Sequence, residues 1–213
     1  MSKNPWPRQK PLPGSQIDWS HPLAPSVACW PYSEGAGNYL NEVSRNLGAT
    51  LYGSFSWGNN GVVFNGSDVY AERLDHPSLT LQQFSVVSLL RWDGVLRVAP
   101  NDWGCPWSKG VYPSGEYTLL MRQTSGFDIE FRFYIQGVQR TTYTWGAGDT
   151  SDHVVICTYN QSKADIYMDG RLGASSTPGA ITIADSSQPW RMGRQADTNY
   201  HWGGHIYGVF VYP

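Results

Sequence analysis

The sequence predicts an all-β protein, and three observations lead to that fold class. Short segments rich in Val, Ile, Tyr, Phe and Trp recur between clusters of Gly, Asn, Asp and Pro. No segment after residue 25 has the apolar spacing of an amphipathic helix. The 213 residues are 40% hydrophobic and 15% charged, enough for one large domain that folds without a disulfide or a metal. We therefore expect a β-sandwich or barrel.

The alternation of apolar and polar side chains locates the individual strands. Residues 127–133 alternate strictly, so one face of that strand is apolar and the other is charged. Residues 160–163 separate two β-prone segments and predict a hairpin, and Asp169 with Gly170 suits a turn with positive φ. The predicted strands comprise residues 85–92, 117–122, 127–133, 153–159, 164–168 and 205–212.

The charge composition argues against two kinds of partner. Fifteen Lys and Arg against seventeen Asp and Glu give a net charge of −2, so the broad basic surface of a nucleic-acid-binding protein is missing. No apolar run approaches the about 20 residues that a membrane span requires, and the N-terminus lacks the apolar stretch of a signal peptide. We expect neither a nucleic-acid partner nor a membrane partner.

The three cysteines show no metal or redox motif. Cys29, Cys105 and Cys157 lie far apart in the sequence, and an odd number leaves at least one thiol unpaired. Cys29 and Cys157 lie in strand-like apolar segments, so we expect both to be buried as small apolar side chains. Cys105 falls in a segment that we predict to be a loop.

Residues 1–25 predict an extended N-terminal arm. They contain six of the fourteen prolines, and proline lacks an amide donor and restricts the residue before it. The first sixteen residues carry three basic side chains and no acid. The arm is either a disordered tail or a basic arm that lies on a neighbouring acidic surface, and its large aromatics favour the second. The candidate attachment residues are Lys3, Trp6, Arg8, Lys10 and Trp19.

From residue 26 onward the order of motifs resembles the laminin-G-like domains of the concanavalin A-like group. The segments CWPYSEGAG at 29–37 and VSRNLG at 43–48 resemble their opening, and VFNGSDVY at 63–70 resembles one of their turns. Residues 152–170 resemble their central hairpin, and residues 190–206 resemble their last two strands. The resemblance implies a two-sheet antiparallel jelly-roll sandwich over residues 26–213, with a face and loops that bind glycans or proteins in relatives.

The same resemblance bears on calcium. Relatives with a calcium site usually carry an acidic residue in the closing strand, where this chain has Tyr207 and Gly208. Because calcium favours several oxygen ligands, including carboxylates, we expect no metal and no cofactor. A calcium ion at a loop stays open as an alternative.

The segment IDWSHPL at residues 17–23 resembles the N-terminus of bacteriophage-encoded members of this group. It implies a non-enzymatic virion-surface protein of the capsid decoration or head-fibre type, made in the host cytoplasm and located on the virion. Its partner would be the major capsid protein or another virion protein, and it would form a dimer or trimer. The alternative is a lectin-like adhesion domain that binds cell-surface glycans. A second alternative is a glycoside hydrolase.

Residues 100–115 form the predicted loop, and its length together with its aromatics indicates a function. Its side chains suit stacking on sugar rings, or anchoring a protein interface, while a third interpretation is that the loop covers a sandwich edge. The candidate binding residues are Asn101, Asp102, Trp103, Trp107, Lys109 and Tyr112. We expect the remaining strand-associated indoles to lie in the core: Trp30, Trp92, Trp145 and Trp190.

Catalysis is not the favoured interpretation. Asp128 and Glu130 would project from one face of a strand about 7 Å apart, near the spacing of paired glycosidase acids. The hydrolases of this group, however, carry a third acid where this chain has Gly126, and Arg132 continues the same face as a charged stripe. His201 and His205 flank a Gly-Gly turn, with no helix to align them on a zinc ion. We therefore predict no enzyme.

Overall fold

The computed structural model describes residues 28–32, 34–43, 45–58, 61–94, 103–111, 115–123, 128–146, 149–195 and 200–213. In these ranges the regular structure is β apart from one short 3₁₀ turn, Pro77–Leu79. No helix in the described ranges is long and apolar enough to cross a membrane. The all-β prediction is confirmed.

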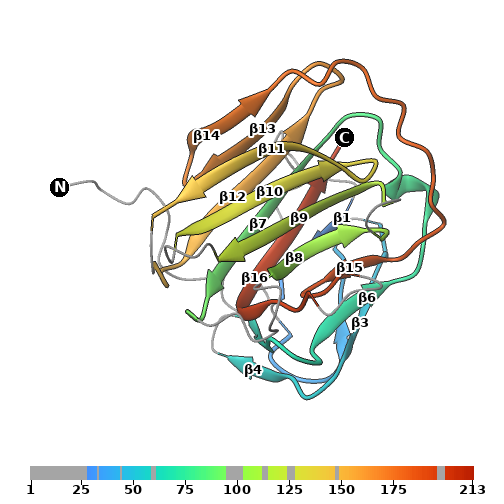
Figure 1. Ribbon diagram of the computed structural model, residues 1–213. Coiled ribbons are helices and arrows are strands. Elements are labelled where there is room, and N and C mark those ends of the chain that lie inside the picture. Colours follow the sequence, from blue (N-terminus) through green and yellow to red (C-terminus); the bar gives the residue numbers. More distant parts are fainter. Residues whose placement is uncertain are drawn as a thin grey trace.

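The strands form two antiparallel sheets of eight strands each, which Figure 1 shows as two stacked layers. Sheet A has the order β14-β13-β12-β7-β16-β5-β4, and β1 pairs with β16. Its strands are β14 (Arg171–Ser176), β13 (Ala164–Met168), β12 (His153–Tyr159), β7 (Phe84–Trp92), β16 (Gly203–Tyr212), β5 (Gly61–Asn65), β4 (Ser56–Gly58) and β1 (Ala28–Trp30).

Sheet B has the order β11-β10-β9-β8-β15-β6-β3-β2, so strands distant in sequence lie side by side. Strand β15, for example, pairs with β8 on one side and with β6 on the other. The strands of sheet B are β11 (Val138–Trp145), β10 (Ile129–Ile135), β9 (Tyr117–Gln123), β8 (Trp103–Lys109), β15 (Trp190–Met192), β6 (Tyr70–Arg73), β3 (Ala49–Tyr52) and β2 (Tyr39–Leu40).

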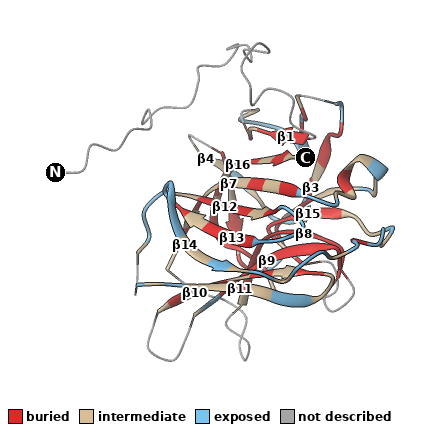
Figure 2. Ribbon diagram, turned by 90° about the horizontal axis from the view of Figure 1, so that it is seen from above, coloured by how far each residue is buried: buried red, intermediate tan, exposed pale blue. Residues whose placement is uncertain are grey.

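The core lies between the two sheets and is built by alternation along the strands. Every second residue of β7 is buried, from Phe84 to Trp92, and the central strands of both sheets contain most of the buried residues in Figure 2. Three indoles stack across the core: the ring of Trp190 lies 5.8 Å from that of Trp30 and 5.8 Å from that of Trp107. The predicted core positions of Trp30, Trp92 and Trp190 are confirmed, and Trp145 packs partly buried against the core.

The strand predictions are confirmed with shifts of one or two residues at their ends. The hairpin between β12 and β13 turns at residues 160–163, where the side chain of Asn160 accepts hydrogen bonds from the amides of Ser162 and Lys163. Asp169 and Gly170 both have positive φ in the following turn, as predicted.

The loop prediction for residues 100–115 is wrong for its central part. Trp103–Lys109 form β8, which lies between β9 and β15 in sheet B, and Cys105 is buried there. Gly104 and Pro106 look like loop residues in the sequence. Pro106 has no amide hydrogen to donate to a neighbouring strand, and a register shift between Gly104 and Trp107 accommodates it. The carbonyl of Pro106 accepts a hydrogen bond from the amide of Gly193 at 2.9 Å.

All three cysteines are buried and unpaired. Burial is the main cause that raises the pKa of the Cys29 thiol to about 12, and it also raises the pKa of Cys105 and Cys157. These thiols are therefore protonated apolar side chains at neutral pH, as predicted for Cys29 and Cys157.

Candidate functional site

The structure divides the predicted binding residues into three groups. Trp107 and Lys109 are completely buried, so the expectation that they lie on a binding surface is wrong. Trp103 is partly exposed at the start of β8. The other predicted site residues lie outside the described residues: Asn101, Asp102 and Tyr112, and Lys3, Trp6, Arg8, Lys10 and Trp19 of the arm.

Trp103 begins a row of side chains across four strands of sheet B. It pairs with Arg122 on β9, which in turn pairs with Glu130 on β10. Residues directly opposite each other share one face of a sheet, and the neighbours Met121 and Phe131 face the core. The row therefore lies on the outer face of sheet B. We name it the Trp103 row, and it consists of Trp103, Arg122, Glu130 and Thr144.

Two guanidinium groups lie against the Trp103 indole. The Cζ atom of Arg132 is 4.9 Å from the ring centroid, and that of Arg122 is 5.5 Å away. The ring of Tyr200 lies 5.8 Å from the same indole. The Nε of Arg132 also donates to Glu130, so the charged stripe predicted for this strand is present. Although partial burial acts against the charged form, this hydrogen bond contributes to a raised pKa of Arg132.

A second aromatic group with two arginines lies farther along the same face. The rings of Tyr52 and Tyr70 stack with centroids 5.0 Å apart. The Cζ atom of Arg191 lies 5.3 Å from the ring centroid of Tyr70, and that of Arg194 lies 5.2 Å from it. The Nε of Arg191 also forms an ion pair with Glu72 at 2.6 Å. We name Tyr52, Tyr70, Arg191 and Arg194 the Tyr70 cluster.

Arg194 of the Tyr70 cluster and Tyr200 beside Trp103 lie close together, because the amide of Gln195 donates to the carbonyl of Tyr200 at 3.4 Å. Arg194 forms a β-bridge with His201, and the carbonyl of Arg194 accepts from the hydroxyl of Ser108 on β8 at 3.4 Å. His201 is buried, and burial together with the neighbouring Arg194 charge lowers its pKa to about 4. A neutral imidazole at this bridge avoids a second positive charge beside Arg194.

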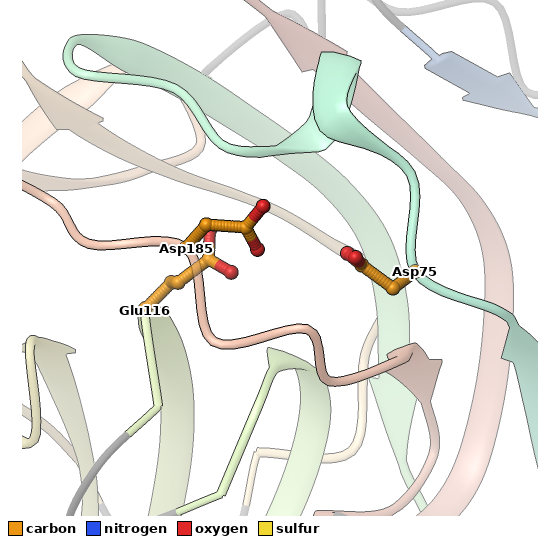
Figure 3. A group of neighbouring side chains, drawn as sticks. All are labelled: Asp75, Glu116 and Asp185. Carbon is orange, nitrogen blue, oxygen red and sulfur yellow. The ribbon is translucent and has the colours of Figure 1, made fainter.

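A separate group of acids in the described residues has the spacing of metal ligands. Figure 3 shows that Asp75, Glu116 and Asp185 come from three separate segments and direct their carboxyl groups toward one another. Their ligand atoms lie within 4.8 Å of one another. The Nζ of Lys109 lies 2.5 Å from Asp75 and 2.9 Å from Glu116. The ammonium therefore supplies the positive charge that balances part of this group. The arrangement is an ionic network in which Lys109 and Glu116 are buried, Asp75 is partly buried and Asp185 is exposed.

The two histidines flagged in the sequence do not share a site. His201 lies at the bridge to Arg194, whereas His205 of β16 contacts Arg91 of β7, with 2.6 Å between Nε2 and the guanidinium nitrogen. Within the described residues, neither histidine belongs to a group of potential metal ligands.

Sequence reasoning missed most of the outer-face residues. Tyr70, Arg122 and the group Arg191, Arg194 and Tyr200 lie far apart in the sequence, so no local spacing brings them together. The one available signal was the strict alternation of residues 127–133, which placed Glu130 and Arg132 together on the outward face.

Comparisons with known proteins support the fold. No family model matches the chain, and no curated protein does. Among solved structures, Trypanosoma rangeli sialidase in complex with sialic acid superposes with a TM-score of 0.63 at 15% identity, over 90% of this chain and 31% of that chain. This chain therefore spans less than a third of the sialidase. The likeness concerns one part of that enzyme.

Two further structures are matched over most of this chain. Domain 4 of the extracellular GH43 arabinanase AbnA from Geobacillus stearothermophilus, in complex with arabinotriose, has a TM-score of 0.60 at 14% identity, over 88% of this chain and 91% of that chain. The binding domain of Paraclostridial Mosquitocidal Protein 1 has a TM-score of 0.64 at 11% identity, over 88% of this chain and 48% of that chain. The chain is thus a jelly-roll-like β-sandwich of the concanavalin A-like type.

Proposed function

We propose that this chain is a carbohydrate-binding module whose ligand lies on the outer face of sheet B. The observation that carries the proposal is the Trp103 indole, which lies on that face in contact with two guanidinium groups and Tyr200. Aromatic rings bind the apolar faces of sugars, while guanidinium and hydroxyl groups bind sugar oxygens. Thr144, at the far end of the Trp103 row, is exposed and adds a hydroxyl.

The structural neighbours support this proposal without fixing a ligand. One neighbour is a domain of a carbohydrate-active enzyme in complex with arabinotriose, and another is the binding domain of a toxin. At 11 to 14% identity the likeness concerns the fold, so the choice of site rests on the outer-face residues of this chain.

We propose binding and not hydrolysis. An acid pair needs one carboxyl group as the proton donor and a second as the base or nucleophile. Glu130 is ion-paired with Arg132, and its carboxylate serves to hold that guanidinium over Trp103. The Glu130 carboxylate is therefore engaged in a contact that orders this face, which favours a binding role.

The test is a glycan array followed by titration calorimetry on the best ligand, with Trp103→Ala against the native chain. We expect the variant to lose about tenfold or more in affinity, the range for removing an aromatic stacking partner. Trp57→Ala is the matched control, because Trp57 is a partly exposed indole on β4 of sheet A. Equal affinity of the native chain and Trp103→Ala would contradict the proposed site.

A second candidate function is attachment to a symmetric virion through the N-terminal arm and an edge or face of sheet A. Ile156, Val87 and Phe210 lie opposite one another on β12, β7 and β16, and all three are partly exposed. The solvent face of an antiparallel sheet is normally polar, so this apolar row favours an association surface. Such attachment would place the protein on the virion surface, with a capsid protein or further copies of itself as partners.

Arm deletion tests this second candidate. We predict that a chain lacking residues 1–22 folds normally, as judged by circular dichroism, but no longer co-sediments with assembled particles. Unchanged particle occupancy would remove the arm from the attachment mechanism and leave sheet A as the attachment surface, and a native chain that does not co-sediment with particles would contradict this second candidate.

A further inference from the structure

We infer that the outer face of sheet B binds an anionic sugar, and that Arg122 contacts the carboxylate or sulfate group of that sugar. The inference rests on the proposed carbohydrate-binding function and adds the chemical class of the ligand.

The arginines of this face differ in how their charge is balanced. Arg132 is ion-paired with Glu130, and Arg191 is ion-paired with Glu72. Arg122 is exposed, and its contact with the described residues is the face of the Trp103 indole. Glu130 lies directly opposite Arg122 in the ladder, yet its Oε1 accepts from Arg132. Among the described carboxylates, none lies within ion-pair distance of Arg122.

The surroundings of Arg122 hold its side chain ready for a ligand. A guanidinium on an aromatic face keeps its N–H groups at the edge of the plane, where they can donate. The indole beneath it also contacts the guanidinium of Arg132 and the ring of Tyr200. A planar guanidinium held in this way donates two parallel hydrogen bonds to a carboxylate or a sulfate, and it loses little rotamer freedom on binding.

The electrostatics of the site add to the selectivity for an anion. Arg132 stays protonated, with a raised pKa, and its charge adds to that of Arg122 beside one indole. Glu130 offsets one of these two charges, so the group retains a net positive charge on a chain whose overall charge is −2. A neutral sugar offers only hydroxyl acceptors to Arg122, whereas an anionic sugar forms charge-assisted hydrogen bonds, which are about twice as strong.

The experiment compares matched oligosaccharides on the full chain by titration calorimetry. The probes are lactose, sialyllactose and a sulfated lactose, measured at low and high NaCl, after an array of neutral, carboxylated and sulfated glycans. We expect at least one anionic probe to bind about tenfold or more tighter than lactose. We also expect added salt to weaken the anionic probe selectively, because charge-assisted contacts at an exposed site are screened.

Variants at Arg122 separate charge recognition from folding. Arg122→Gln is expected to weaken binding of the anionic probe much more than binding of lactose, so that the preference for the anionic probe is lost. Arg122→Lys keeps the charge but not the planar fork, and it is expected to retain part of the preference. Arg171→Gln is the matched control, because Arg171 is an exposed arginine on β14 of sheet A.

The outcomes distinguish this inference from the proposed function. Preferential binding of sialyllactose assigns the carboxylate, and preferential binding of the sulfated probe assigns the sulfate. Equal binding of neutral and anionic glycans, or a preference that survives Arg122→Gln, overturns the inference while carbohydrate binding stands. Absence of binding to every glycan on the array overturns both.

Discussion

The ammonium of Lys109 lies 2.9 Å from Oε1 of Glu116, and neither side chain is exposed to solvent. The same ammonium contacts Asp75 and donates to the carbonyl of Gln188 at 2.7 Å. The Glu116 carboxylate also accepts from the amide and the hydroxyl of Ser186. One buried lysine therefore connects β8 to three other segments of the chain. Its removal leaves a buried carboxylate without its counter-charge.

We expect Lys109→Met to destabilise the fold by about 3–5 kcal/mol, because breaking a buried ion pair leaves a buried charge uncompensated. Urea unfolding measures the change, with Lys163→Met as the control, since Lys163 is exposed in the turn between β12 and β13. Adding Glu116→Gln to Lys109→Met should recover part of the loss. A double variant as unstable as the sum of the two single variants would contradict this account.

Trp103 and Trp107, two residues that the sequence places in one group, should behave differently. Trp107→Ala removes a fully buried indole stacked on Trp190 and is expected to cost about 3–5 kcal/mol of stability. Trp103→Ala removes a partly exposed outer-face indole and is expected to change stability much less while it weakens glycan binding. Thermal unfolding and calorimetry on both variants check the prediction. Equal stability losses would place Trp103 in the core.

Stability should fall as the pH drops from about 6.5 to about 4, because of His201. In the unfolded chain this histidine binds a proton near its ordinary pKa of 6.5, whereas burial and Arg194 lower its pKa to about 4 in the folded protein. Between these values only the unfolded chain is protonated. The contribution is fully present above pH 6.5 and is lost on acidification, up to about 3 kcal/mol.

Urea unfolding of the native chain and of His201→Gln at pH 7 and at pH 4.5 measures this contribution. The variant should lose less stability on acidification than the native chain. Some pH dependence is expected to remain, because burial and Arg91 also lower the pKa of His205. Identical pH profiles for the two proteins would exclude His201 as the source.

Gly204 should not tolerate a side chain. It has a φ of +139°, and a Cβ there would lie 2.1 Å from the carbonyl oxygen of Arg91 on the neighbouring strand. Gly179 also has a positive φ, of +78°, but a Cβ there meets no atom within 4 Å. Gly179→Ala should therefore cost about 1–2 kcal/mol from backbone strain alone, and Gly204→Ala should cost more. Chemical denaturation of both variants makes the comparison, and equal costs would contradict the steric argument.

Local pattern was sufficient for the fold class and for most of the strands. Residues 127–133 alternate strictly in the sequence, and the structure forms β10 from Ile129 to Ile135 with Glu130 and Arg132 outward. Such alternation can be read without knowledge of neighbouring strands, because side chains of one strand point to opposite faces in turn. The buried positions of Cys29 and Cys157 follow from the same reasoning.

The site depends on strand pairing, which no local pattern encodes. Trp103, Arg122 and Glu130 meet because β8, β9 and β10 pair in one particular register, and a shift of one residue would turn each side chain to the opposite face. The strand that contains Trp103 was itself missed, because Gly104 and Pro106 are unfavourable in an isolated strand. In the folded chain, β9 and β15 pair with β8 on either side and a register shift accommodates the proline, so long-range pairing overrides the local preference.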